Sequence, residues 1–99
     1  MPTLRRDEVL ACLAQHRDAL RAYSVRSLSL FGSVARDEAT AESDVDILVE
    51  FETPVGMFKF LDLKDYLEEL LGAEVDLVTP RALKPQLREQ IFREMTRAT

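Results

Sequence analysis

Two aspartates, Asp44 and Asp46, open an alternating apolar run that is typical of a strand. Side chains two positions apart point to the same face of a strand, with Cα atoms about 6.5–7 Å apart. Two carboxylates at this spacing can both reach a pair of divalent ions about 3.5–4 Å apart. Without cations they repel each other, and aspartate is a poor strand former. Two aspartates at the start of a strand are unfavourable for the strand itself, and such a local conflict indicates a functional site.

A third acid and a glycine–serine pair could complete such a site. Asp76 lies near the start of another strand pattern, and Gly32-Ser33 precedes a short predicted helix that runs to Arg36. Glycine lets the backbone approach a ligand closely, serine supplies a hydroxyl and a helix cap, and free N–H groups at a helix start suit a phosphate. Hydrogen-bond donors that bind phosphate, placed opposite metal-binding carboxylates, are typical of sites that transfer phosphoryl or nucleotidyl groups. Arg36 could bind a phosphate, or it could pair with Glu42 or Asp37.

The elements that must position these residues follow from the apolar periodicity. We expect three strands, over residues 27–31, 45–51 and 74–79. We also expect a helix over about 4–23, a helix that follows a turn at 53–56 and ends at Gly72, and a last helix from about 85. Strands interleaved with helices predict an α/β fold with a small sheet packed against helices.

The strand directions follow from the connections. The second and third strands are joined by a helix, and such a crossover makes neighbouring strands parallel. Parallel strands start at the same edge of the sheet, which brings Asp76 to Asp44 and Asp46. Gly32-Ser33 follows the first strand, so it reaches this edge only if that strand runs antiparallel to the second. The sequence therefore predicts a mixed sheet.

The residues that carry these signals resemble a known family. The runs GSVARDEATAESDVDILVEF, EVDLVT and ALKPQLREQIFREM are similar to minimal nucleotidyltransferases (MNT) of the polymerase-β-like superfamily, short proteins usually paired with a HEPN-domain partner. The resemblance covers the chain from about Arg5 to Met95. The chain departs from many of these relatives at Asp37, where they carry glycine.

The resemblance implies a role for each site residue. Gly32 and Ser33 would hold the triphosphate of ATP, Asp44 and Asp46 would bridge two Mg²⁺ ions, and Asp76 would ligate one ion and help deprotonate the attacking hydroxyl. By the same resemblance the chain would be a protein adenylyltransferase and an antitoxin, which moves AMP from ATP to a tyrosine of a HEPN ribonuclease toxin.

Composition bounds these expectations. The 99 residues predict a single domain, 1–99, with a net charge of -5. Residues 1–80 hold 8 basic and 16 acidic side chains, and residues 81–99 hold 5 and 2. So acidic a chain is not expected to bind nucleic acid directly. We expect no membrane span, because the apolar runs are short. The absence of a signal-peptide pattern and the single cysteine, Cys12, favour the cytoplasm.

Two other functions and several structural explanations remain open at this point. The chain could be an antitoxin that neutralises its toxin by docking alone, or a general nucleotide-binding module of a larger assembly. The basic tail is best explained as a solvated helix face. His16 and Cys12 lie on or beside the apolar stripe of the first helix, which favours core residues, and Phe58 falls off the stripe of its helix and could contact a partner.

Overall fold

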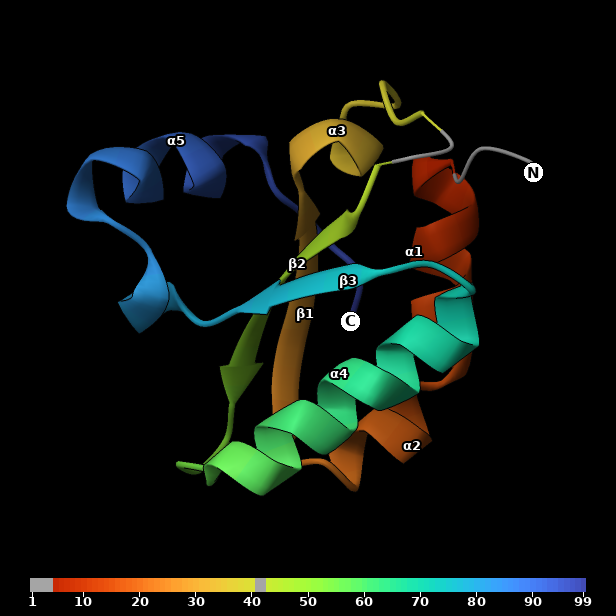
Figure 1. Cartoon of the computed structure of the whole chain (residues 1–99), viewed down its shortest axis with the longest axis vertical. Coiled ribbons are helices and arrows are strands. Elements are labelled where there is room, and N and C mark those ends of the chain that lie inside the picture. The colour runs from red at the N-terminus through yellow and green to blue at the C-terminus, as the bar shows by residue number, and fades with distance from the viewer. Residues whose placement is uncertain (1–4, 41–42) are drawn as a thin grey trace.

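A four-stranded mixed sheet organises the residues that the computed structural model describes, 5–40 and 43–99 (Figure 1). In chain order the elements are α1 (Arg6–Gln15), α2 (Arg17–Arg21), β1 (Val25–Phe31), α3 (Gly32–Ala35), β2 (Val45–Phe51), α4 (Met57–Leu71), β3 (Val75–Val78), the 3₁₀ helix η1 (Pro80–Ala82), α5 (Pro85–Glu94) and β4 (Thr96–Arg97). The strands lie in the order β3-β2-β1-β4.

The strand directions confirm the predicted mixed sheet. β1 runs antiparallel to β2, and β2 runs parallel to β3. Asp46 faces Phe31 of β1 on one side and Asp76 of β3 on the other. The antiparallel pairing places the end of β1 beside the start of β2, so Gly32 reaches the same edge as the acids.

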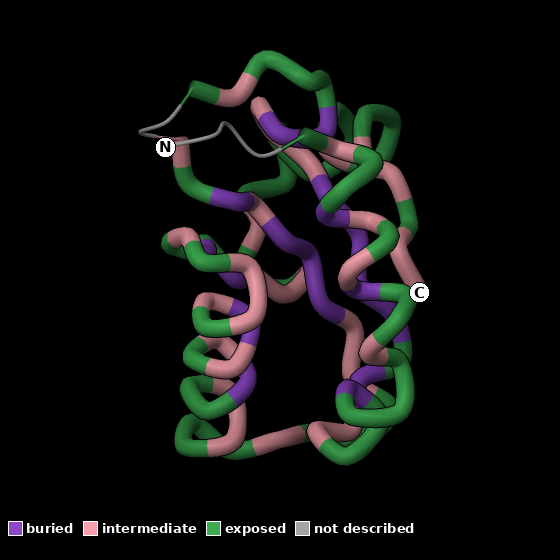
Figure 2. Tube along the Cα trace, turned by 90° about the vertical axis from the view of Figure 1, so that its right-hand side faces the viewer, coloured by how far each residue is buried: buried purple, intermediate pink, exposed green. Residues whose placement is uncertain are grey.

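One face of the sheet carries the hydrophobic core. Alternate residues of the strands, among them Leu28, Leu30 and Ile47, are fully buried against α1, α2 and α4. The buried stretches run along the strands, whereas the helices are buried only on their inner side (Figure 2). Leu63 and Leu67 anchor α4 in this core. Gly72 ends α4 in the left-handed conformation with φ 65°, as its position after the last apolar residue predicts.

The other face of the sheet is covered much less. α5 lies across the strands from α1 and α4 (Figure 1) and buries none of its residues completely. Leu87 and Phe92 on this helix remain 46% and 40% exposed. Phe31, Asp46 and Asp76 belong to the less covered face, because they alternate with the core residues along their strands. The fold therefore leaves the predicted site accessible.

The first helix is shorter than predicted and is interrupted at His16. The N–H of His16 bonds to Leu13 O at 3.2 Å, and its ring Nδ1–H donates to Cys12 O at 2.8 Å. The ring thus takes the carbonyl that the backbone of a continuous helix would use. α1 ends at Gln15 and α2 begins at Arg17. Leu4, the predicted helix start, lies outside the described residues.

Two short elements were not predicted. η1 follows Thr79 with Pro80 at its first position, and β4 adds two residues beside Ser29 and Leu30 of β1. Neither is long enough to show an apolar period. Among residues 5–40 and 43–99, no helix has the length and apolarity that a membrane span requires.

Candidate active site

Gly32 and Asp46 are in close contact at the edge of the sheet. Gly32 has φ 73°, a conformation that favours glycine, and a Cβ added to it would overlap with Asp46 Oδ2. Two separate constraints therefore require glycine at this position. The contact brings the Asp46 carboxylate against the backbone that begins α3.

Asp46 and Asp76 form the centre of an acidic group. They face each other across the parallel strands β2 and β3, whose backbones lie about 4.8 Å apart. Partial burial raises the pKa of Asp46 to about 6, and the negative charges of Asp76 and Asp44 and a side-chain hydrogen bond with Asp76 add to this increase. The charge of Arg36 acts in the opposite direction. The predicted convergence of the three acids on one edge is therefore present in the fold.

The three carboxylates are not arranged as the ligands of one metal ion. Within residues 5–40 and 43–99, no group of three His, Cys, Asp or Glu side chains surrounds one point closely enough to hold a metal ion. Asp44 precedes β2 by one residue, is exposed, and acts on Asp46 through charge alone. An ion bound by all three carboxylates would therefore require a rearrangement of their side chains.

Ser33 has a free hydroxyl but does not cap α3. Phe31 occupies the cap position and offers no side-chain bond, so the predicted serine cap is wrong. Ser33 lies inside the first turn and is partly exposed. Its hydroxyl has no hydrogen-bond partner among the described residues, whereas its carbonyl accepts a bond from Glu38 N at 2.8 Å. The hydroxyl is thus available to a ligand beside Asp46.

Arg36 pairs with residues that the sequence analysis did not single out. Its Nε donates to Glu38 Oε2 at 3.1 Å, and its Nη1 donates to Glu94 Oε2 at 3.3 Å. Hydrogen bonding and charge from Glu38, followed by Glu94, raise the pKa of the exposed Arg36 further above its ordinary value. Asp37 is not its partner, and Glu42 lies outside the described residues. Because Glu94 is 58 residues away in sequence, no local pattern could have predicted this pair.

Asp37 occupies a backbone conformation that favours glycine. Its φ is 55°, in the left-handed region, where a residue with a side chain is less stable than glycine. Asp37 Oδ1 accepts a hydrogen bond from the Arg6 backbone N at 2.8 Å. This bond joins the end of α3 to the start of α1 and offsets part of the backbone cost.

Other candidate residues lie away from the acids. A hollow of about 670 Å³ is found at the far end of β2, where it is lined by apolar residues such as Phe51, Val55 and Met57. Neither it nor His16, which bonds within α1, belongs to the acidic edge. Phe58 is 86% exposed, as its position off the helix stripe predicts.

Comparison with known proteins agrees with this arrangement. The family described as nucleotidyltransferase domain matches residues 13–98. Protein adenylyltransferase MntA of Thermococcus cleftensis is 43% identical over 96 residues, which are 96% of this chain and 97% of that protein.

Solved structures share the fold. One described as a candidate minimal nucleotidyltransferase has a TM-score of 0.81 and 38% identity, and the match covers 94% of this chain and 95% of that one. A chain of the complex between a tri-AMPylated Shewanella oneidensis HEPN toxin and its MNT antitoxin has a TM-score of 0.66 and 22% identity, over 92% of this chain and 71% of that one. At this identity the second likeness shows the fold alone. The chain thus belongs to the nucleotidyltransferase domain family and is one of its minimal enzymes.

Proposed function

We propose that this enzyme transfers AMP from ATP to a tyrosine of a HEPN-family ribonuclease toxin and thereby acts as its antitoxin. The observation that carries the proposal is the Asp46 carboxylate, held against Gly32 and opposite Asp76. The name of the Thermococcus relative, which aligns over almost the whole chain, supports a protein as the acceptor. The AMPylated HEPN toxin in the Shewanella complex supports the kind of acceptor.

Mg²⁺ fits the acidic edge by its chemistry. Asp44, Asp46 and Asp76 offer only carboxylate oxygens, the ligands that Mg²⁺ prefers. Burial, followed by repulsion from Asp76 and Asp44, raises the pKa of Asp46, and a bound cation would offset the repulsion. Bound Mg²⁺ would neutralise charge on the triphosphate and polarise its phosphoryl oxygens. Asp44, Asp46 and Asp76 are the residues that would hold the ions.

The residues of the chain have separate roles in the proposed reaction. Gly32 and Ser33 bind the triphosphate, with the free Ser33 hydroxyl as a hydrogen-bond donor to a phosphate oxygen. Asp76 accepts the proton of the tyrosine hydroxyl as the oxygen attacks the α-phosphorus. A new P–O bond forms to the tyrosine, the bond to the β-phosphate bridge breaks, and pyrophosphate leaves. Arg36 can support phosphate charge once it is released from Glu38 or Glu94.

The exposed side of α5 is the proposed docking surface for the toxin. Leu87 and Phe92 are large apolar residues that the fold leaves 46% and 40% exposed. The Arg36–Glu94 pair joins the end of α5 to α3 and so places this surface beside the acidic edge. A tyrosine presented by a protein bound there would lie near the site of AMP transfer.

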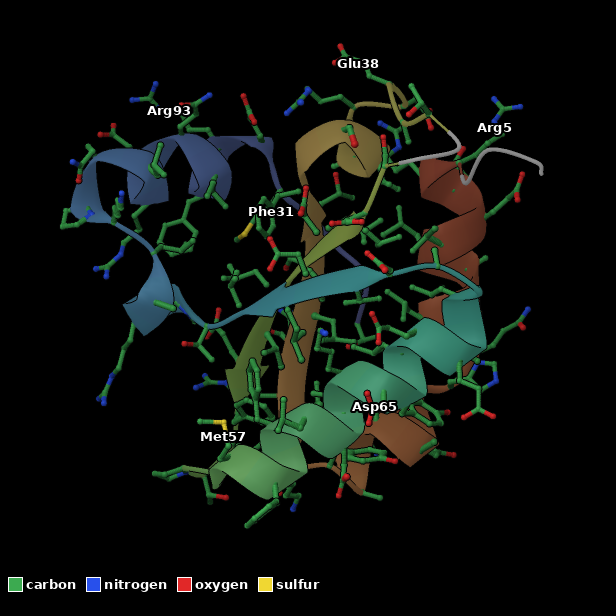
Figure 3. All side chains as sticks on the ribbon, viewed as in Figure 1. Arg5, Phe31, Glu38, Met57, Asp65 and Arg93 are labelled. Carbon is green, nitrogen blue, oxygen red and sulfur yellow. The ribbon has the colours of Figure 1, made fainter. Side chains whose placement is uncertain are left out.

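Intact-mass analysis tests the proposal. A purified HEPN partner encoded beside this chain is incubated with the enzyme, ATP and Mg²⁺, and its mass should increase by one AMP unit per transfer. Asp44→Asn removes one ligand charge with little change in volume, so the rate should fall at least about a thousandfold, which corresponds to about 4 kcal/mol of transition-state stabilisation. Asp65→Asn, an exposed aspartate on α4 away from α3, is the matched control and should keep full activity (Figure 3).

The outcomes separate catalysis from docking. An Asp44→Asn variant that still binds the toxin but no longer protects cells would support the enzyme. Full protection by this variant, with no increase in the mass of the toxin, would instead favour an antitoxin that acts by docking alone.

A further inference from the structure

Four arginines surround a second hollow at the end of the sheet that lies opposite the acids. The hollow has a volume of about 340 Å³, and its lining includes Arg17, Arg21, Arg26, Arg97 and one acid, Glu52. We call it the arginine pocket. α2 lies at the lower end of the molecule in Figure 1, and α3 lies at the upper end. The seven residues of β1 separate the two ends by about 20 Å.

Glu52 offsets only part of the positive charge of the arginine pocket. Among the described residues, Arg17, Arg21 and Arg26 make no hydrogen bond or ion pair with their side chains, and Glu52 pairs with none of the arginines. Arg97 uses its Nε, which donates at 2.8 Å to the main-chain oxygen of Thr99, another residue of the lining, and its two terminal nitrogens have no hydrogen-bond partner among the described residues. Because arginine stays protonated at every physiological pH, the lining keeps an excess of positive charge that a bound anion would offset.

The arginines come from three separate elements that the backbone directs to one place. Arg17 and Arg21 are four residues apart and therefore share one face of α2. Arg26 is the extra residue of a β-bulge, because its neighbours Val25 and Ser27 pair with the consecutive residues Phe51 and Glu50. Such bulges redirect a side chain from the regular alternation of a strand. Arg97 is added by the edge strand β4.

We propose that the arginine pocket binds a ligand with a chain of phosphate groups. Each guanidinium offers a planar pair of donors that matches two phosphate oxygens. A phosphate chain concentrates several negative charges over a few ångströms, and so it can satisfy several guanidinium groups within one hollow. The carboxylates of an acidic protein segment are held farther apart by its backbone. The pocket is independent of AMP transfer, because it lies at the other end of β1 from Asp46.

Calorimetry with inorganic tripolyphosphate tests the proposal. The titration is carried out with the full chain in EDTA and low salt, so that no divalent ion joins the probe to the acidic edge. We expect a dissociation constant at or below about 1 mM, and affinity that falls as salt rises because the contacts are exposed. The double variant Arg21→Gln/Arg26→Gln should weaken binding at least about tenfold. The variant Arg17→Gln/Arg97→Gln removes the other half of the pocket and should have a similar effect.

A matched control and two further probes make the result specific. Arg5→Gln removes one positive charge, half the number that each double variant removes, at an exposed position at the other end of the molecule (Figure 3), and it should bind tripolyphosphate as the natural chain does. ATP in EDTA tells a nucleotide from a free phosphate chain: tighter binding of ATP assigns the pocket to nucleotides, and equal binding assigns it to the phosphates alone. Unchanged affinity in both double variants, no binding of either phosphate probe, or equal binding of a hexaglutamate peptide would overturn the proposal.

Discussion

Asp46→Asn should stabilise the enzyme in the absence of metal, although it removes a central residue of the site. The Asp46 carboxylate is partly buried and lies near Asp76 and Asp44, and these surroundings raise its pKa from 3.8 to about 6. Ionised Asp46 is therefore less favourable in the folded chain than in the unfolded chain. Asparagine resembles the protonated form of the residue and can donate to the Asp76 carboxylate.

The pKa shift sets the size and the pH range of this effect. A difference of about two pKa units corresponds to at most about 3 kcal/mol. Solvent screening reduces it, because Asp46 is only partly buried, so we expect about 1–2 kcal/mol at pH 8. The folded chain binds this proton more tightly than the unfolded chain. The contribution to stability is therefore greatest below pH 4 and is lost as the pH rises from about 4 to 6.

Urea unfolding at pH 8 and pH 5 in EDTA measures the difference between the natural chain and the Asp46→Asn variant. The variant should be more stable at pH 8, and about half of its advantage should be gone at pH 5, where the natural Asp46 is mostly protonated. Asp65→Asn, far from the acids, should show neither effect. An Asp46→Asn variant that is no more stable than the natural chain at pH 8, or an advantage that does not depend on pH, would refute the electrostatic reasoning.

Further substitutions test the backbone of the site and its docking surface. Gly32→Ala should lower the free energy of unfolding by about 1–3 kcal/mol, because alanine is strained at φ 73° and its Cβ meets Asp46. Gly56→Ala is the control: its φ is -78° and the space around it is open, so the free energy measured by urea unfolding should change little. Leu87→Ser/Phe92→Ser should weaken toxin binding at least about tenfold in calorimetry, while the free energy of unfolding falls by about 1–2 kcal/mol, since the side chains are 46% and 40% exposed and lose only part of their burial. Unchanged affinity would place the docking surface elsewhere.

The parts of the fold that could be predicted are those governed by local periodicity. Alternation over residues 45–51 located β2, and the crossover between β2 and β3 led to parallel pairing and hence to the meeting of Asp46 and Asp76. The break at His16 could not be predicted, because a ring nitrogen competes there with a backbone N–H for one carbonyl.

Long-range contacts account for the other differences. The partner of Arg36 depends on how α5 returns to α3, and β4 forms only because Thr96 and Arg97 meet the edge of β1. The arginine pocket was missed for the same reason. Its members are spread from residue 17 to residue 97, and only the folded chain brings them together.

The two ends of the sheet carry clusters of like charge that the fold offsets only in part: carboxylates near the start of β2, opposed by Arg36, and guanidinium groups near the start of β1, opposed by Glu52. If both clusters are retained for ligands, a substitution that relieves repulsion in either should stabilise the chain without ligand. Arg21→Gln should therefore add a few tenths of a kcal/mol at low salt, and less at high salt, because the arginines are exposed. The clusters are about 20 Å apart, so the effects of Arg21→Gln and Asp46→Asn should add within about 0.5 kcal/mol. Urea unfolding of the two single variants and the double variant measures this sum. A larger deviation from additivity would mean that the two clusters are coupled through the sheet and are not independent sites.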